Sequence, residues 1–190
     1  MRERYIRPAI IAVKRPPFHG AKPGFRDMMK GVRRGQAMLR TDIEIRIAIT
    51  EDAEAISRTI VNALHESNAR DYAPPVIERI AASFTPHHIA RQLAERHVLV
   101  ATLSGEIVGT VSLEKNVLRS FFVDPAYHGQ GVGTALLEEI EGLAAANGHF
   151  SLAVAASVTA EHFYRRRGFT ALREVVQGNV RVILMAKELD

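Results

Sequence analysis

Residues 117–137 read VLRSFFVDPAYHGQGVGTALL and combine three features in one short stretch. An apolar run is ended by an Asp-Pro pair, and Gly129, Gly131 and Gly133 then precede a segment with the apolar spacing of a helix. Glycine is unfavourable inside a helix, so three glycines where a helix begins need a reason. The N–H groups at a helix N-terminus attract anions, and glycines let a bulky anion approach them closely. The stretch therefore predicts a strand, a phosphate-binding loop and a helix, with a plain strand-to-helix turn as the alternative.

Two common phosphate-binding patterns do not fit this loop. The P-loop pattern GxxxxGK[ST] fails because no lysine follows the glycines. The dinucleotide pattern GxGxxG fails because Thr134 and Leu136 stand where a third glycine is needed. A G-x-G-x-G loop after an apolar strand remains.

The segments on either side carry alternating strand and helix signals. Strands are predicted at 43–49, 97–103, 107–113, 117–123, 151–156, 170–176 and 180–189. Helices are predicted at 50–65, with Thr50 as the N-cap, and at 76–83, 87–95, 132–146 and 157–166. The hairpins and the irregular element order indicate an α/β fold of the α+β type, with a mixed sheet rather than a regular βαβ winding.

A second segment, SVTAEHFYRRRGF at 157–169, ends in the pattern F-Y-x-x-x-G-F about thirty residues after the glycine loop. The two segments, in this order, resemble the GNAT superfamily of N-acetyltransferases, whose acyl-CoA-binding core is [Q/R]-x-x-G-x-[G/A]. The resemblance covers about residues 43–190 and implies the GNAT-like fold, a central mixed sheet flanked by helices, for a domain at 41–190. Two positions depart from the family: His128 replaces the usual Gln or Arg, and Ser157 replaces a frequent Asn.

The resemblance implies acetyl-CoA as the acyl donor. The backbone of the glycine loop would hold the pyrophosphate, a ring N–H of His128 would point at a phosphate, and the edge of the strand before the loop would pair with the pantetheine arm. Ser157 can equally be a helix cap. The residues expected at the cofactor are Phe122, Val123, His128, Gly129, Gln130, Gly131, Val132, Gly133, Thr134 and Ser157.

The resemblance also implies direct attack of an amine on the thioester in a ternary complex. Tyr164 matches the family's tyrosine and is the expected general acid for the departing thiolate, with aromatic packing as its alternative role. Glu114 is the candidate general base, with a solvated hairpin residue or a water chain as alternatives. The segment 65–72 falls where the family shapes the acceptor site, although a surface loop is the simpler interpretation. One arginine of 165–167 could contact the 3′-phosphate of CoA, although a solvated helix end is the simpler interpretation.

The composition excludes several classes of protein. The chain has no cysteine, which excludes disulfides, thiolate nucleophiles and cysteine-based zinc sites. His87 and His88 are adjacent, so they point apart on a helix, and no metal site is expected. No apolar run is long enough to span a bilayer or to form a signal peptide, so we expect a cytoplasmic protein without membrane contact.

The charge is concentrated at the N-terminus. Residues 1–40 hold eleven Lys or Arg and two Asp or Glu, whereas the rest of the chain is mildly acidic. We expect a basic, disordered extension. A nucleic-acid or anionic-surface contact, a targeting peptide and a translation start at Met38 stay open.

These observations lead to one principal function and two alternatives. The principal prediction is an N-acetyltransferase that acts on a primary amine of a small molecule, peptide or protein. The alternatives are an acyl-CoA-binding regulatory module without turnover and a nucleic-acid binder that uses the basic extension, against which the acidic domain argues. The sequence names no acceptor and leaves a homodimer open.

Overall fold

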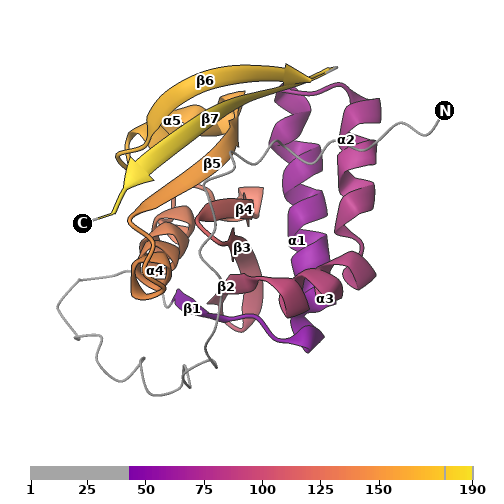
Figure 1. The fold of residues 1–190 in the computed structure, drawn as a ribbon. Helices are drawn as coiled ribbons and strands as arrows, with labels where there is room; N and C mark the ends of the chain where they lie inside the picture. Colours follow the sequence, from indigo (N-terminus) through magenta and orange to yellow (C-terminus); the bar gives the residue numbers. More distant parts are fainter. Residues whose placement is uncertain (1–42, 178, 190) are drawn as a thin grey trace. The chain divides into compact units, whose positions relative to one another are not determined.

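The computed structural model describes residues 43–177 and 179–189, in which a mixed sheet lies between two groups of helices (Figure 1). The strands are β1 (Glu44–Ile47), β2 (His97–Leu103), β3 (Glu106–Glu114), β4 (Val117–Val123), β5 (Ser151–Ser157), β6 (Thr170–Gln177) and β7 (Val180–Glu188). The α-helices are α1 (Ala53–Glu66), α2 (Pro74–Ala81), α3 (Pro86–Glu95), α4 (Val132–Ala146) and α5 (Val158–Arg165). The extension predicted for residues 1–40 and the alternative start at Met38 lie outside the described residues.

The seven strands are arranged in the order β1-β2-β3-β4-β5-β7-β6. Neighbouring strands are antiparallel except for β4 and β5, which are parallel. The predicted mixed α/β sheet is confirmed, and each predicted strand and helix is present with small differences at its ends. Three connections in the sheet are tight hairpins, β2 to β3, β3 to β4 and β6 to β7, because only two residues separate the strands in each.

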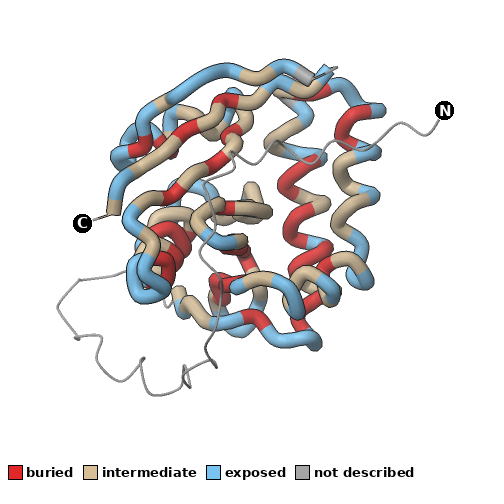
Figure 2. Tube along the Cα trace, viewed as in Figure 1, coloured by how far each residue is buried: buried red, intermediate tan, exposed pale blue. Residues whose placement is uncertain are grey.

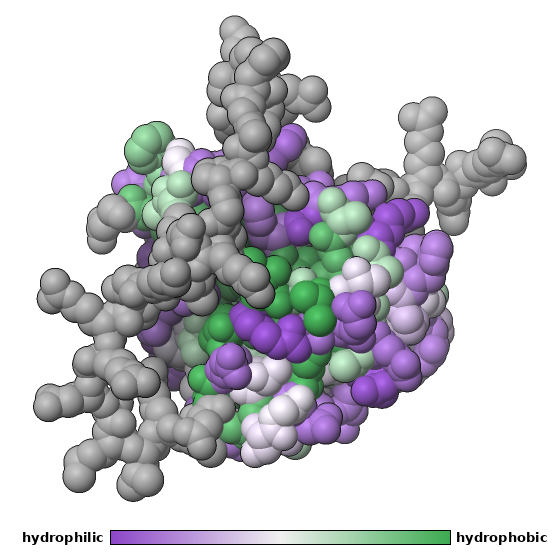
Figure 3. All heavy atoms as spheres, turned by 90° about the horizontal axis from the view of Figure 1, so that it is seen from below, coloured by the Kyte–Doolittle hydropathy of each residue, from purple (hydrophilic) through white to green (hydrophobic). Residues whose placement is uncertain are grey.

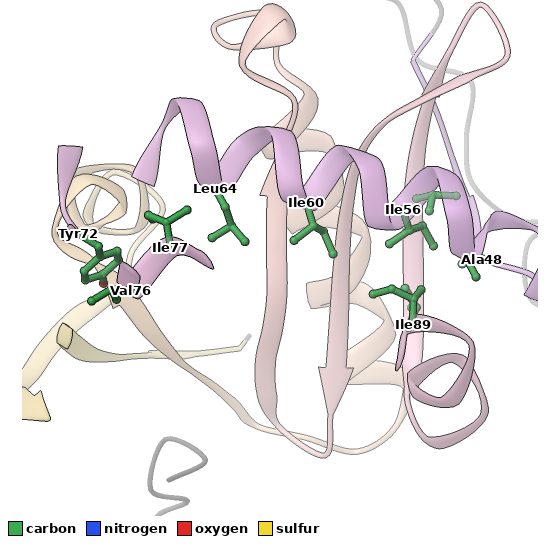
Figure 4. Packing of buried hydrophobic residues seen from close by; sticks show 11 residues of the cluster. Ala48, Ile56, Ile60, Leu64, Tyr72, Val76, Ile77 and Ile89 are labelled. Carbon is green, nitrogen blue, oxygen red and sulfur yellow. The ribbon is translucent and has the colours of Figure 1, made fainter. Parts of the chain in front are cut away.

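Helices α1, α2 and α3 cover one face of the sheet. Ile56, Ile60 and Leu64 follow the 3.6-residue period of α1 and point to one side of the helix (Figure 4). They are almost fully buried in one cluster with Val98 and Val100 of β2. Buried positions recur along α1 in Figure 2. Burying a side chain of this size contributes about 1.5–3 kcal/mol, so the cluster fixes α1 against the sheet.

Helix α4 covers the opposite face of the sheet, and its first turn packs closely against β3. A Cβ atom on Gly109 of β3 would lie 3.0 Å from side-chain atoms of both Val132 and Leu136. Real Cβ atoms are not found much closer than this, so the first turn of α4 sits at this distance because β3 has a glycine there. The position of the glycine loop is thereby fixed relative to the sheet.

The connection from β1 to α1 differs from the prediction in its cap. Thr50 was expected to cap the helix, but its side chain makes no capping hydrogen bond and it opens a 3-10 turn instead. The Asp52 carboxylate accepts a hydrogen bond from the backbone N–H of Ile49 at 2.8 Å. It also accepts two hydrogen bonds from the Arg46 guanidinium at 2.6 and 2.8 Å. The buried carboxylate thus accepts from the N–H of the residue before the 3-10 turn, and neither it nor Thr50 caps α1 through its side chain.

No helix in the described part of the chain is long and apolar enough to cross a membrane. Seen from below, apolar residues gather in one area of the surface and hydrophilic residues lie around them (Figure 3).

Candidate active site

The sheet opens between β4 and β5. Their parallel pairing is limited to residues 117–118 against residues 153–154. Beyond these pairs β4 continues to Val123 and β5 to Ser157, and the two strands separate toward their carboxyl ends. An open strand edge at such a separation can pair with an extended ligand.

A β-bulge in β4 lies at the separation. Thr110 and Ser112 of β3 face Phe122 and Arg119 of β4, so β4 has one residue more than β3 between these pairs. Within the bulge Ser120 adopts a left-handed φ of 47°, which is uncommon for a residue other than glycine. A bulge bends its strand and changes where the neighbouring side chains point.

The glycine loop presents backbone groups at the start of α4. Gly131 is the N-cap residue, with a left-handed φ of 90°, and the first helical hydrogen bond runs from the Ala135 N–H to its carbonyl at 3.0 Å. The N–H groups of residues 132–134 therefore have no acceptor within the helix. A Cβ atom at Gly129 or Gly131 would meet nothing within 4 Å, so both glycines border open space. The loop thus presents free backbone N–H groups of the kind that an anion-binding site uses.

Gly133 differs from Gly129 and Gly131 because it faces a side chain and not open space. A Cβ atom at this position would lie 3.4 Å from the Phe163 ring of α5. The F-Y-x-x-x-G-F segment thus packs directly on the first turn of α4. The two motifs, about thirty residues apart in the sequence, form one site.

The His128 ring was predicted to point an N–H at a phosphate, but in the structure it is bonded to the protein backbone. Its Nε2–H donates to the Val123 carbonyl at 3.0 Å. The N–H of Asp124, in the same peptide unit as that carbonyl, donates to Val108 of β3 at 2.9 Å, so the carbonyl points away from β3 and toward the opening. The N–H of Val123 also points toward the opening, because the N–H and the C=O of one residue in an extended strand point to the same side. The His128 ring therefore donates to a backbone carbonyl at the opening, and the same N–H is not directed at a phosphate bound by the loop.

Four aromatic rings pack at the base of the opening. Phe121 of the bulge lies edge-on to Phe163 and Tyr164, with ring centroids 5.7 and 6.1 Å apart. Phe169 packs on the other side of Tyr164 at 5.3 Å. Phe122 instead packs on Phe84 at 5.6 Å, so its predicted contact with the cofactor concerns its backbone.

Tyr164 is buried, with 4 % of its surface exposed. Its hydroxyl makes no hydrogen bond to a residue in the described ranges, 43–177 and 179–189. Burial raises the pKa of Tyr164 well above its ordinary value, so the phenol stays protonated at neutral pH. The Tyr164 hydroxyl is therefore a protonated group whose ring is held by aromatic packing.

Arg167 connects α5 with the glycine loop. Its guanidinium donates to the Thr134 hydroxyl and lies over the Phe163 ring, 5.8 Å from the centroid. Arg165 is paired with Glu161 at 2.7 Å on the same helix. Of the three arginines considered from the sequence, the structure places Arg167 at the loop.

The loop before α2 bridges the two halves of the sheet. Tyr72 is buried and donates from its hydroxyl to the carbonyl of Arg181 at 2.9 Å, so a surface loop was the wrong interpretation for this residue. Asp71 accepts hydrogen bonds from Thr159 of α5. Ser157 caps α5 by accepting from the Ala160 N–H at 3.3 Å, which confirms the capping alternative.

Glu114 lies one strand away from the point where β4 and β5 separate. It faces Val117 at the start of β4. Its Oε2 accepts from the Arg119 Nε at 3.1 Å and lies 3.9 Å from Arg96. One of the two carboxylate oxygens of Glu114 is therefore already paired with arginine in this structure.

Histidine pairs do not form a metal site in this part of the chain. The rings of His87 and His88 are 6.1 Å apart and tilted. Among the described residues, no group of three or more His, Asp or Glu side chains is arranged to hold a metal ion.

Comparisons with known proteins agree with this geometry. The family model for the acetyltransferase (GNAT) domain matches residues 68–189. A GCN5-related N-acetyltransferase from Rhodopseudomonas palustris is 31 % identical, with a TM-score of 0.74 over 81 % of this chain and 100 % of that one. The uncharacterized N-acetyltransferase YafP of Escherichia coli (strain K12) is 28 % identical over 70 % of this chain and 85 % of its own length. PaiA N-acetyltransferase from Thermoplasma acidophilum, solved with coenzyme A, has a TM-score of 0.68 at 19 % identity over 77 % of this chain and 99 % of that one.

These matches show that the chain is an acyltransferase. The chain belongs to the GNAT acetyltransferase family.

Proposed function

We propose that this protein transfers an acetyl group from acetyl-CoA to a primary amine by direct attack within a ternary complex. The observation that carries the proposal is the separation of β4 from β5 next to the free N–H groups of residues 132–134. Binding of coenzyme A by the related PaiA protein supports the choice of cofactor.

The cofactor has a defined path in this proposal. Its pyrophosphate lies on the backbone of the glycine loop, where a helix N-terminus favours negative charge. Its pantetheine arm runs along β4 from Val123 toward the bulge and pairs with backbone groups as an added strand does. The thioester then lies near the closed end of the opening, beside the aromatic rings around Tyr164.

The acceptor nitrogen must lose two protons in the reaction, and the departing sulfur must gain one. The acceptor enters as an alkyl ammonium, which must lose a proton before its nitrogen attacks the carbonyl carbon. A tetrahedral intermediate forms, and a backbone N–H of β4 stabilises its oxyanion. The C–S bond then breaks, the Tyr164 hydroxyl gives its proton to the departing sulfur, and the second proton of the attacking nitrogen returns to the Tyr164 oxygen. Glu114, released from Arg119, or a water chain accepts the ammonium proton.

A screen with labelled acetyl-CoA against amines and peptides tests the proposal. We expect the label to move to at least one amine, with release of free CoA in equal amount. Binding of acetyl-CoA without transfer to any amine would instead support an acyl-CoA-sensing module. Absence of acetyl-CoA binding would refute both functions.

A further inference from the structure

The glycine loop has no basic side chain of its own that could meet a phosphate. The sequence contains no Lys or Arg between Arg119 and Arg165, a segment that includes the whole loop and α4. Three glutamates, at positions 138, 139 and 141, lie on α4. A pyrophosphate at this loop would therefore meet backbone dipoles but no cation from the loop or from α4.

His128 does not supply that cation in the observed arrangement. Its Nε2–H is committed to the Val123 carbonyl, which faces the strand opening. A ring held there cannot place the same N–H on a phosphate bound by residues 132–134. The charge has to come from another element.

Arg167 is the residue that reaches the loop from outside. Its guanidinium contacts the Thr134 hydroxyl, on a residue whose own N–H is one of those free for an anion. A guanidinium has five N–H donors, so the contact with one hydroxyl leaves others for a ligand. The cation-π contact with Phe163 helps to hold the guanidinium in place before any ligand arrives, which lowers the cost of ordering it.

We propose that Arg167 binds the pyrophosphate of the acyl-CoA and supplies the positive charge that the loop lacks. The inference rests on the proposed function, because it assumes that acyl-CoA is the ligand. Arg165 and Arg166 are not assigned this role: Arg165 is paired with Glu161, and Arg166, which is exposed, has no contact with the loop among the described residues.

Calorimetric titration of CoA and of dephospho-CoA into three proteins tests the inference. The proteins are wild type, Arg167→Gln and Arg166→Gln, which removes the same charge one residue earlier. We expect Arg167→Gln to lower the affinity for both ligands by the same factor, about tenfold, because both ligands carry the pyrophosphate. Arg166→Gln should bind dephospho-CoA within about twofold of wild type. The affinity of Arg167→Gln should also depend less steeply on salt concentration than that of wild type, and Arg167→Lys should recover part of the loss.

The other outcomes separate this inference from the proposed function. Loss of affinity for CoA but not for dephospho-CoA in Arg167→Gln would move the contact to the 3′-phosphate and overturn the inference. If Arg166→Gln lost as much affinity for dephospho-CoA as Arg167→Gln, the inference would be overturned and the proposed function would stand. Wild-type affinity in Arg167→Gln would have the same consequence. A lower melting temperature of ligand-free Arg167→Gln with an unchanged salt dependence would show a merely structural role. A wild-type protein that does not bind CoA would refute the proposed function itself.

Discussion

Asp71 accepts two hydrogen bonds from Thr159, which lies 88 residues later in the chain: one from the hydroxyl at 2.6 Å and one from the backbone N–H at 3.2 Å. The carboxylate of the loop before α2 thus caps the first turn of α5, which carries Tyr164. This contact ties a segment packed with α1 to the far half of the sheet, across the opening between β4 and β5.

Replacing Asp71 with alanine should destabilise the protein by about 1 kcal/mol, the usual cost of losing a helix cap. Asp71→Asn keeps one acceptor and should lose less. Urea unfolding of the two variants measures the difference. An unfolding free energy of Asp71→Ala equal to that of wild type would mean that this cap is not formed in solution.

Tyr164→Phe should lower kcat by about 10²–10⁴-fold and leave the affinity for acetyl-CoA nearly unchanged. The ring packs on Phe121, Phe163 and Phe169, and phenylalanine preserves these contacts. The measurement uses an acceptor found in the amine screen, with CoA binding followed in parallel. A wild-type rate with chemistry rate-limiting would assign the proton transfer to another donor. A large loss of affinity with normal kcat would mean that Tyr164 packs the cofactor.

The stability of the fold should decrease in alkali because of the same residue. Burial raises the pKa of Tyr164 above the value of about 10 that it has when unfolded. Above about pH 10 the unfolded chain has lost this proton while the folded chain keeps it, so the unfolding free energy falls as pH rises. The unfolding free energy of Tyr164→Phe minus that of wild type should therefore increase between about pH 8 and pH 11, because only wild type has this tyrosine to titrate. The buried Tyr72 is present in both proteins, so a constant difference would contradict the raised pKa of Tyr164.

Asp52 should make the unfolding free energy depend on pH in the acid range, with stability falling as pH falls. Its hydrogen bonds with Arg46 lower the pKa of this carboxyl below its ordinary value. The stabilisation is present above about pH 4 and is lost as pH falls through the lowered folded value. Asp52→Asn should therefore be less stable than wild type at neutral pH, and the two should converge at low pH. Glu54→Gln is the matched control: it breaks an exposed pair with Arg58 and should change stability little at either pH. A difference between Asp52→Asn and wild type that persists in acid would assign the effect to packing.

The sequence predicted the elements because their signals are local. The alternation of β1 and the helical spacing of Ile56, Ile60 and Leu64 each depend on neighbouring residues. The glycine loop and the F-Y-x-x-x-G-F segment were also predicted together, since both are contiguous patterns.

The contacts that complete the site could not be predicted in this way. The Arg167 contact with Thr134 spans 33 residues, and the Asp71 contact with Thr159 spans 88. Ser120 gives no sequence signal for a left-handed conformation, because serine is uncommon there. The position of the His128 ring depends on which way the Val123 carbonyl points, and that follows from the pairing of β4 with β3.

Calorimetric titration of acetyl-CoA into wild type, Gly131→Val and Gly148→Val tests the proposed cofactor site most directly. Both glycines have a left-handed φ and open space around the missing Cβ, so valine adds comparable backbone strain at each. Only Gly131 borders the free N–H groups of α4, whereas Gly148 follows the far end of that helix. We predict that wild type and Gly148→Val bind acetyl-CoA with similar affinity, and that folded Gly131→Val binds at least about tenfold more weakly, or about 1.4 kcal/mol. Equal affinity in all three folded proteins would contradict the assignment of the glycine loop as the pyrophosphate site.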